Sequence, residues 1–547
     1  MCAMKFRLLI RIIVIVSVVL VCTGFGVYSF LWLDTVERQK DFDLHTLVPQ
    51  DAIAVLQTDR MAELVQDVNG LQCSEEGHFL YVSDLFTYLK KYLQTFVDDR
   101  PHGLSAQMNR MLISFHEPDN KLNQVLYCSL GAGDSKLVEV FIQKYTSSHF
   151  PAKQTDYRGR SISIYPMSGG RFLAAYFTSD YLVVSFQKRL IEQVIDAVAD
   201  KSSLMELPSF RSMHLGKRAN VSATLYVRMK SIDMGGDADT VRTAAQLGGW
   251  GEFDLKLKDD AVYCSGLSHG ADSTLTFVNA LRKQRPIELF PGQLLPGTTF
   301  FYDFWSVSDG QEVWNFVQSQ QYAGSGYSDY IKARDEEWIG FLNEYGGGRI
   351  LSCLFHPKDT VDTRPCAVMR VPIVDVLHAE RKLQSLLYAT PREKDAPPFQ
   401  WSSPQYRLYP QARPYRQYVL PRNTLLARLA GIAGAALHTY ACFYKGSLLL
   451  APDARSLSAY ICAMEENDLL EGIPLYEASV EGLAPVYNFL MMADMEEIMS
   501  QEETSVRLVP NFFFRHSDFF RHFILSIQFT CTDGVVYPNV VLLYKGG

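Results

Sequence analysis

The segment from Phe172 to Ser185 reads FLAAYFTSDYLVVS, and a segment of the same pattern, HTYACFYKGSLLLA, runs from His438 to Ala451. Each has two apolar arms around a turn-forming centre, Thr178-Ser179-Asp180 in the first and Tyr444-Lys445-Gly446 in the second. This pattern is typical of a tight antiparallel hairpin. Because it recurs at long range, we expect the chain to contain two related structural parts.

Other landmarks recur in the same order, which strengthens the interpretation as an internal repeat. Three pairs stand out: Phe115-His116-Glu117-Pro118 with Phe355-His356-Pro357, Ile164-Tyr165-Pro166 with Leu408-Tyr409-Pro410, and Asp259-Asp260-Ala261-Val262-Tyr263 with Asp533-Gly534-Val535-Val536-Tyr537. The repeat also tests functional motifs, because a motif that matters only in one copy should be missing from the other.

Helical and strand-like patterns alternate through both copies, with short hairpins between them, which predicts an α+β fold of antiparallel sheets with packed helices. The 547 residues are too many for one core. The predicted fold class is an N-terminal transmembrane helix followed by two duplicated domains. The predicted segments are a cytoplasmic tail (1–11), a transmembrane anchor (12–33), a linker (34–46), a first repeat (47–285) and a second repeat (286–547) with an insertion at 412–436.

The N-terminus has the pattern of a membrane anchor. Lys5, Arg7 and Arg11 precede an uncharged run from Ile12 to Leu33. At about 1.5 Å per residue this run is long enough for a hydrocarbon core of roughly 30 Å. The basic residues lie only before it, which predicts a cytoplasmic tail and an exported remainder. A cleaved signal peptide is the alternative, although its apolar part is normally only about 7–15 residues.

Composition excludes some classes of function. The net charge of −8 leaves no basic surface of the kind that nucleic-acid binding requires, so no nucleic-acid partner is expected. The ten cysteines form no CxxC pair, so neither a zinc ribbon nor a thioredoxin-like site is predicted. We expect no metal and no cofactor. The cysteines lie mostly in apolar contexts and are interpreted as small core residues.

One local motif suggests nucleophilic catalysis. Ser185 and Lys188 have the S-x-x-K spacing that can bring a serine and an activating lysine together. The second copy has Ala451 and Ala454 at these positions. The repeat therefore argues against a catalytic role.

Four histidines are candidates for ligands or bases. His116 and His356 recur at the same place in both copies, where a structural role at a strand end is favoured. His516 and His522 flank Asp518, which is too few ligands at too loose a spacing to indicate a metal site.

The insertion at 412–436 is the most concentrated cationic and aromatic segment of the predicted exported region. Arginine and tyrosine are enriched at interaction surfaces, and arginine binds carboxylates and phosphates. Alternatively, the insertion caps the second domain and pairs its arginines with the protein's own acids. The predicted partner-binding residues are Arg413, Tyr415, Arg416, Tyr418, Arg422 and Arg428.

The basic tail, the uncharged run and the strand opening Val48-Pro49-Gln50-Asp51-Ala52 resemble a family of single-pass bacterial envelope proteins. That family is classified as a domain of unknown function in the Bacteroides-like group. The resemblance implies placement in the bacterial envelope and implies no catalytic residues.

Two functions follow as hypotheses. The first is a membrane-anchored extracytoplasmic binding or scaffolding protein without a catalytic site, in the bacterial inner membrane with a periplasmic bulk. Its partner would be an envelope protein or an anionic ligand. The second is an envelope hydrolase with a non-local active site, for which the nameable residues are Ser185, Lys188, His516 and His522.

Overall fold

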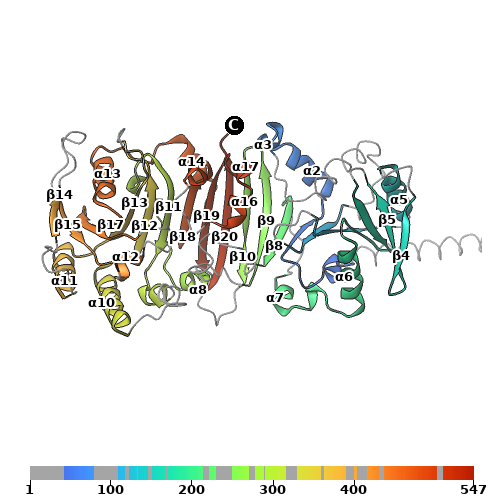
Figure 1. Ribbon diagram of the computed structural model, residues 1–547, viewed down its shortest axis with the longest axis horizontal. Coiled ribbons are helices and arrows are strands. Elements are labelled where there is room, and N and C mark those ends of the chain that lie inside the picture. Colours follow the sequence, from blue (N-terminus) through green and yellow to red (C-terminus); the bar gives the residue numbers. More distant parts are fainter. Residues whose placement is uncertain are drawn as a thin grey trace, which may run out of the picture. The chain divides into compact units, whose positions relative to one another are not determined.

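The elements of the protein are labelled in Figure 1, which shows the computed structural model. The structure describes residues 42–78, 109–117, 122–131, 134–145, 151–167, 170–213, 221–228, 249–269, 277–288, 290–315, 329–358, 362–389, 399–402, 415–422, 424–429, 437–501 and 509–546. The chain divides into two compact units: the first comprises residues 1–66 and 81–214, and the second comprises 67–80 and 215–547.

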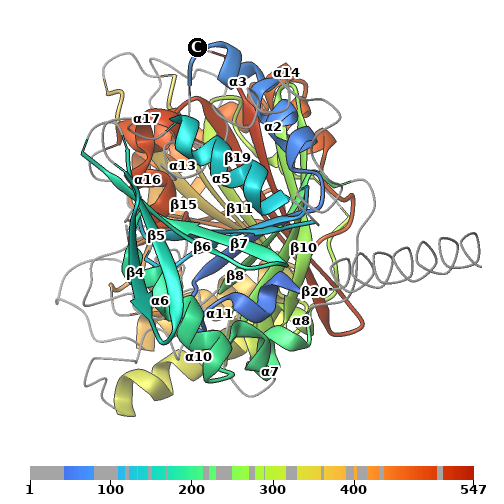
Figure 2. The ribbon, with the colours of Figure 1, turned by 90° about the vertical axis from the view of Figure 1, so that its right-hand side faces the viewer.

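The first unit has an antiparallel sheet with the strand order β4-β5-β6-β7-β3-β2-β1. Its strands are β1 (Ala54–Thr58), β2 (Met111–Phe115), β3 (Gln124–Ser129), β4 (Lys153–Tyr157), β5 (Arg160–Pro166), β6 (Phe172–Phe177) and β7 (Tyr181–Ser185). The helical segments that start within this unit are η1 (Leu44–Leu47), α2 (Met61–Asn69), α5 (Asp134–Tyr145), α6 (Lys188–Ala199), η2 (Leu204–Glu206) and α7 (Pro208–Arg211). Figure 2 shows α5 and α6 on opposite sides of strands β5 to β7.

The second unit has a longer antiparallel sheet, in the order β8-β9-β10-β20-β19-β18-β11-β12-β13-β17-β16-β15-β14. Its strands are β8 (Ala223–Arg228), β9 (Trp250–Lys258), β10 (Ala261–His269), β11 (Thr299–Ser306), β12 (Arg349–Phe355), β13 (Cys366–Pro372), β14 (Phe399–Ser402), β15 (Tyr415–Val419), β16 (Tyr440–Tyr444), β17 (Ser447–Ala451), β18 (Phe489–Asp494), β19 (Phe523–Thr532) and β20 (Val535–Tyr544).

Helices cover both faces of this second sheet. They are α3 (Gln72–Glu75), α8 (Phe277–Arg282), η4 (Pro291–Leu294), α10 (Asp329–Tyr345), α11 (Val376–Ala389), α12 (Leu425–Leu429), α13 (Ala454–Glu465), α14 (Pro474–Glu481), α15 (Met495–Ser500), α16 (Asn511–Arg515) and α17 (Ser517–Phe520). In Figure 1, α10, α11 and α12 lie on one side of the sheet and α13 and α14 on the other.

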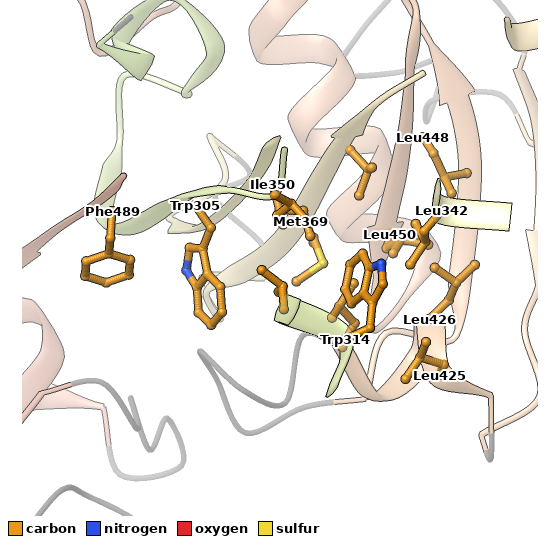
Figure 3. Packing of buried hydrophobic residues seen from close by; sticks show 14 of the residues in the cluster. Trp305, Trp314, Leu342, Ile350, Met369, Leu425, Leu426, Leu448, Leu450 and Phe489 are labelled. Atoms are coloured by element: carbon orange, nitrogen blue, oxygen red, sulfur yellow. The ribbon is translucent and has the colours of Figure 1, made fainter. Parts of the chain in front are cut away.

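Two hydrophobic cores result from this arrangement, because the side chains of a strand alternate between the faces. Strand β11 is buried along its whole length. Its Trp305 packs into one core with Trp338 of α10, and its Tyr302 packs into the other with Tyr460 of α13. Figure 3 shows part of the first core, where Trp305 lies between Phe489 and Ile350, and Trp314 lies among leucines from several elements.

The hairpin turns follow from local sequence. Lys445 and Gly446, at the turn between β16 and β17, both have positive φ, at 40° and 71°. Asp533 and Gly534, between β19 and β20, also do, at 51° and 75°. Two consecutive positive φ values are the signature of the type I′ turn, whose twist matches a two-residue hairpin. Glycine at the second position is favoured there because it lacks a Cβ.

The order β4-β5-β6-β7-β3-β2-β1 of the first unit recurs as β14-β15-β16-β17-β13-β12-β11 in the second. The predicted hairpins at Thr178 and Lys445 are β6–β7 and β16–β17.

The predicted fold class, two duplicated α+β domains behind a membrane helix, is nevertheless wrong. The described chain is mostly large antiparallel sheet, and β8 to β10, which were assigned to the first domain, belong to the second unit's sheet. There β10 pairs with β20, with Ala261 opposite Leu543. This pairing satisfies backbone groups that would otherwise be left open on an edge strand. The sequence pattern of the two terminal hairpins does not reveal that they pair with each other.

The membrane-helix prediction is also corrected. Among the residues that the structure describes, no helix is both long enough and apolar enough to cross a membrane. The predicted anchor (12–33), the tail (1–11) and most of the linker (34–46) lie outside the described residues.

Candidate functional site

The predicted Ser185–Lys188 pair does not form. Ser185 ends β7 with 0% of its surface exposed, and its hydroxyl donates to the carbonyl oxygen of Gln124 at 2.6 Å. The amine of Lys188 instead lies 2.7 Å from Glu192, one helical turn further along α6. The serine therefore has a structural partner and lacks an activating base.

His516 and His522 are not brought together either. The His516 ring packs against Phe512 with their centroids 4.8 Å apart. His522 stacks on His78, with centroids 3.9 Å apart. They form no joint site with Asp518, and within the described residues no group of three His, Cys, Asp or Glu side chains could hold a metal ion.

The predicted arginine-tyrosine insertion is partly a core strand. Tyr415 and Tyr418 are buried in β15. The Tyr418 hydroxyl donates to Glu380 of α11 and accepts from the Gln384 amide at 3.0 Å. Burial, followed by the bond to Glu380, raises the pKa of Tyr418 to about 12. Arg416 also contacts Glu380, at 3.3 Å.

The remaining residues of the predicted patch do not complete it. Arg422 is exposed near the beginning of the connection that follows β15. Arg413 lies outside the described residues, and so does the side chain of Arg428 in α12. The strand pairing also moves the extra residues of the second copy. Because β15 pairs with β16 as β5 pairs with β6, the lengthened connection runs from Val419 to Tyr440 rather than over 412–436.

The first unit contains a Ser-His-Asp hydrogen-bond chain that local motifs did not reveal. The Ser114 hydroxyl lies 2.8 Å from Nε2 of His116, and Nδ1 of His116 lies 3.1 Å from Asp51. Although burial opposes it, the hydrogen bond from His116 keeps the pKa of Asp51 below its ordinary value. Asp51 precedes the histidine by 65 residues, so no short spacing signals the chain.

The Ser-His-Asp hydrogen-bond chain has the connectivity of a catalytic triad, but a substrate cannot reach its serine. Ser114 is 0% exposed, and its hydroxyl also lies 3.2 Å from the Tyr127 hydroxyl. A nucleophile must reach a substrate carbonyl at about van der Waals distance, which a sealed hydroxyl cannot do. In this conformation the chain is a buried polar link between β2, β3 and the segment before β1.

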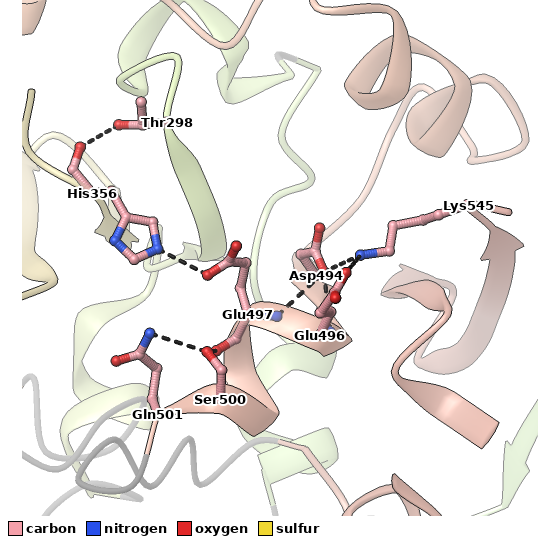
Figure 4. A network of polar contacts seen from close by, with 8 residues as sticks. All are labelled: Thr298, His356, Asp494, Glu496, Glu497, Ser500, Gln501 and Lys545. Carbon is pink, nitrogen blue, oxygen red and sulfur yellow. Dashed lines mark hydrogen bonds and ion pairs between the residues drawn. The ribbon is translucent and has the colours of Figure 1, made fainter. Parts of the chain in front are cut away.

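The corresponding histidine of the second unit lies at an open rim. His356 follows β12, and its Nε2 lies 2.9 Å from Glu497 of α15 (Figure 4). The side chain of His356 is 35% exposed and that of Glu497 is 42% exposed. The hydroxyl of Thr298 donates to the carbonyl oxygen of His356 and so ties this strand end to the start of β11.

The first turn of α15 sets the direction of Glu497. Asp494 is the N-cap, and its carboxylate accepts from the backbone N–H of Glu496 at 3.1 Å. The amine of Lys545 contacts Asp494 at 2.7 Å and Glu496 at 3.1 Å (Figure 4). The hydrogen bond from Lys545 is the main cause that lowers the pKa of Glu496. Glu496 is thereby held toward Lys545, and Glu497 points to the other side, toward His356.

A small hollow adjoins His356, and we call it the His356 hollow. Its floor is apolar and its rim carries charges, including an ion pair of 3.0 Å between Lys358 and Asp468. The lining residues are Pro296, Thr298, Phe355, His356, Pro357, Lys358, Ala459, Ala463, Glu466 and Asp468. The two histidine predictions thus lead to different sites, one sealed and one open.

Comparison with known proteins adds no assignment. The resemblance to bacterial envelope proteins therefore stays a prediction. No protein-family model, no curated protein and no solved structure matches this chain.

Proposed function

We propose that this chain is a binding or scaffolding protein without a catalytic site, and that it contacts a protein partner at the His356 hollow. The observation that carries the proposal is the pair of half-exposed ion pairs at the rim, His356–Glu497 and Lys358–Asp468. They place both signs of charge around a hollow that is lined partly by apolar residues.

Such a rim can exchange partners at low cost. An exposed ion pair contributes only about 0–1 kcal/mol to stability, so a partner's carboxylate or amine can replace either member. Pro357 and Ala463 are partly exposed and supply apolar contact beside these pairs, whereas Phe355 and Ala459 are buried. An apolar centre with a polar rim is the usual anatomy of a protein interface. The partner class that fits is a polypeptide segment with an acidic and a basic side chain flanking a small apolar residue.

The cellular location of this partner is a prediction made from the sequence alone. The periplasmic placement and the envelope partner rest on residues before Phe42, which lie outside the described ranges. Both stay predictions.

Site-specific crosslinking tests the proposal. A photo-crosslinking residue at Lys358 should capture a defined protein in intact cells, whereas the same residue at exposed Lys201 of the first unit should not. The double change His356→Ala with Lys358→Ala should weaken binding of the purified partner at least about tenfold, the equivalent of 1.4 kcal/mol. Lys201→Ala is the matched control.

Two outcomes would contradict the proposal. Undiminished capture from a crosslinking residue at position 358 in the His356→Ala background would mean that the hollow is not the contact surface. Capture from Arg422 and not from Lys358 would favour the insertion predicted from sequence instead.

The alternative function, a hydrolase, has one specific observation in its favour, the chain Asp51–His116–Ser114. It requires an opening that exposes Ser114, since the serine is sealed in β2. A fluorophosphonate probe should then label wild-type protein but not Ser114→Ala. No labelling under native conditions would exclude a serine hydrolase that reacts with this probe class, and labelling retained in Ser114→Ala would exclude this serine.

A further inference from the structure

A short segment of the chain is assigned to the second unit although its neighbours in sequence are not. Residues 67–80 are grouped with 215–547, between two stretches of the first unit. Its described part, residues 67–78, is here called the arm. The arm contains α3, and the backbone N–H of Gln72 donates to the carbonyl oxygen of Asp259 at 2.7 Å.

The arm is held on the second unit by a small apolar contact. Cys73 is buried among Phe520, Phe523 and Tyr544. Leu71 of the arm and several partly buried residues of the second unit surround these four, and the whole cluster is still small compared with the two main cores of this unit. Additional polar contacts are therefore important for keeping the arm in place.

Those polar contacts centre on two stacked imidazoles. His78 of the arm lies parallel to His522, with centroids 3.9 Å apart and an interplanar angle of 18°. Nδ1 of His78 is 2.7 Å from the Tyr544 hydroxyl, which donates to Glu76 at 2.6 Å. Because the Tyr544 hydroxyl donates its proton to Glu76, its oxygen accepts a hydrogen bond from Nδ1–H of His78. One face of each ring is thus covered by the other ring.

The charged groups around this stack come from four elements. Glu76 lies at the end of α3, Arg521 follows α17, Glu496 is in α15, and Lys545 follows β20. Lys545 is paired with Glu496 and Asp494, so its charge is partly compensated. Arg521 and Lys545 disfavour a positive charge on His522, and Glu496 favours one.

We propose that the His78–His522 stack is a pH-sensitive clamp, which holds the arm on the second unit at neutral pH and releases it in acid. Protonation of both rings puts two positive charges face to face at stacking distance, beside Arg521 and Lys545. Like charges at this separation repel, and neutral imidazoles do not. Histidine is the side chain whose ordinary pKa makes this change possible between pH 5 and 8.

The sign of the effect follows from His522. Burial first, and then the charges of His78 and Arg521, lower its pKa from the ordinary 6.5. A base whose pKa is depressed in the folded state stabilises that state above its unfolded pKa and loses the contribution as pH falls. The clamp is therefore closed above about pH 6.5 and weakens below it.

The stack does not suit a metal ion. Each nitrogen lone pair lies in the plane of its ring, and the two planes are stacked nearly parallel, so the lone pairs of the two imidazoles cannot converge on one ion. Nδ1 of His78 is also occupied by Tyr544.

Hydrogen exchange of the full chain tests the clamp. After correction for intrinsic rates, protection of the amides at residues 72–78 should fall at least about tenfold between pH 7.5 and pH 5.5. Protection of β11 should not change in parallel. In His522→Phe, which keeps an aromatic stack but can no longer place a second positive charge against His78, the pH dependence of arm protection should be much weaker than in the wild type.

A nearby histidine provides the matched control. His516→Phe should retain the wild-type pH dependence, because the His516 ring packs on Phe512 and is not part of the His78–His522 stack. If His522→Phe does not fold, His78→Phe serves the same purpose. Equal protection of the wild-type arm at both pH values would overturn the proposal, and so would a pH dependence in His522→Phe as steep as that of the wild type. A parallel loss of protection in β11 would show global unfolding and would also overturn it.

Discussion

The two copies of the seven-strand pattern place a histidine directly after the same strand and give it opposite surroundings. His116, after β2, is 2% exposed and bridges Ser114 and Asp51. His356, after β12, is 35% exposed and pairs with Glu497 at an open rim. Because Leu354 stands where the first copy has Ser114, the second copy has no serine for its histidine. The repeat preserves backbone position and pairing, while side-chain environment has diverged.

At another pair of facing positions, the second copy has the more polar and more deeply buried residues. Gln57 of β1 is opposite Leu112, and at the same place in the second copy Asp303 of β11 is opposite Ser352. Gln57 is half-buried, whereas Asp303 is 1% exposed. Neither carboxylate oxygen of Asp303 has a hydrogen-bond partner among the described residues. One copy therefore has a Ser-His-Asp hydrogen-bond chain, and the other carries a buried carboxyl group beside Ser352 and Trp305, whose polar groups oppose the rise of its pKa.

The largest expected effect comes from that carboxyl group. Burial raises the pKa of Asp303 to about 8, so the group is protonated near neutral pH. An acid whose folded-state pKa is raised stabilises the fold below its unfolded pKa and loses this contribution as pH rises through the folded value. Since one pKa unit corresponds to about 1.4 kcal/mol, the second unit should lose on the order of several kcal/mol of stability between pH 5 and pH 9.

Asp303→Asn removes this titration. Denaturant unfolding at pH 5, 7 and 9 should show a flatter pH dependence for the variant, with its advantage over wild type greatest at pH 9. Gln57→Asp is the matched control in the first copy, where a half-buried carboxylate should produce a much smaller pH dependence. A wild-type second unit that is as stable at pH 9 as at pH 5 would show that Asp303 is not held in the core as described.

The histidines themselves should differ by a smaller amount. His116→Ala removes a buried ring and its bonds to Ser114 and Asp51, which should cost about 2 kcal/mol. His356→Ala breaks an exposed ion pair and should cost less than about 1 kcal/mol. The comparison requires the unfolding transition of each unit to be followed separately. Equal losses would mean that the rim of the His356 hollow is as rigidly packed as the interior of the first unit.

Local signals in the sequence were sufficient for hairpins and helices but not for their assembly. The pattern around Lys445-Gly446 predicts the β16–β17 turn because two-residue hairpins demand particular backbone angles. Nothing local predicts that β3 pairs with β7, or β10 with β20, since these strands meet only after long stretches of chain have folded. The same limitation hid the extent of the second unit's sheet.

The candidate sites were hidden for the same physical reason. His116 was noticed because it recurs, but its partner Asp51 comes from a segment 65 residues earlier. His522 was noticed beside His516, yet its stacking partner is His78 of the arm. The motif Tyr409-Pro410 also suggested a false equivalence with Tyr165-Pro166. The strand register instead places Tyr418 where the first copy has Ser163.

That substitution gives the smallest and most discriminating prediction. Tyr418 fills a core position and bonds to Glu380 and Gln384, so Tyr418→Phe should cost about 1 kcal/mol of stability in the second unit. Arg422 is exposed beyond the strand, and Arg422→Ala should change stability by no more than about 0.5 kcal/mol. Denaturant unfolding of both variants at one pH measures these two changes in the free energy of unfolding.

The pair of variants separates the two interpretations of the arginine-tyrosine segment. If Tyr418→Phe alone destabilises and neither variant weakens the captured partner, then the segment around β15 caps the second unit and recognition belongs elsewhere. If Arg422→Ala leaves stability unchanged but abolishes binding, then the exposed connection after β15 is a contact surface, even though its tyrosines are not. A loss of stability in Arg422→Ala as large as that in Tyr418→Phe would contradict the exposed position of the arginine.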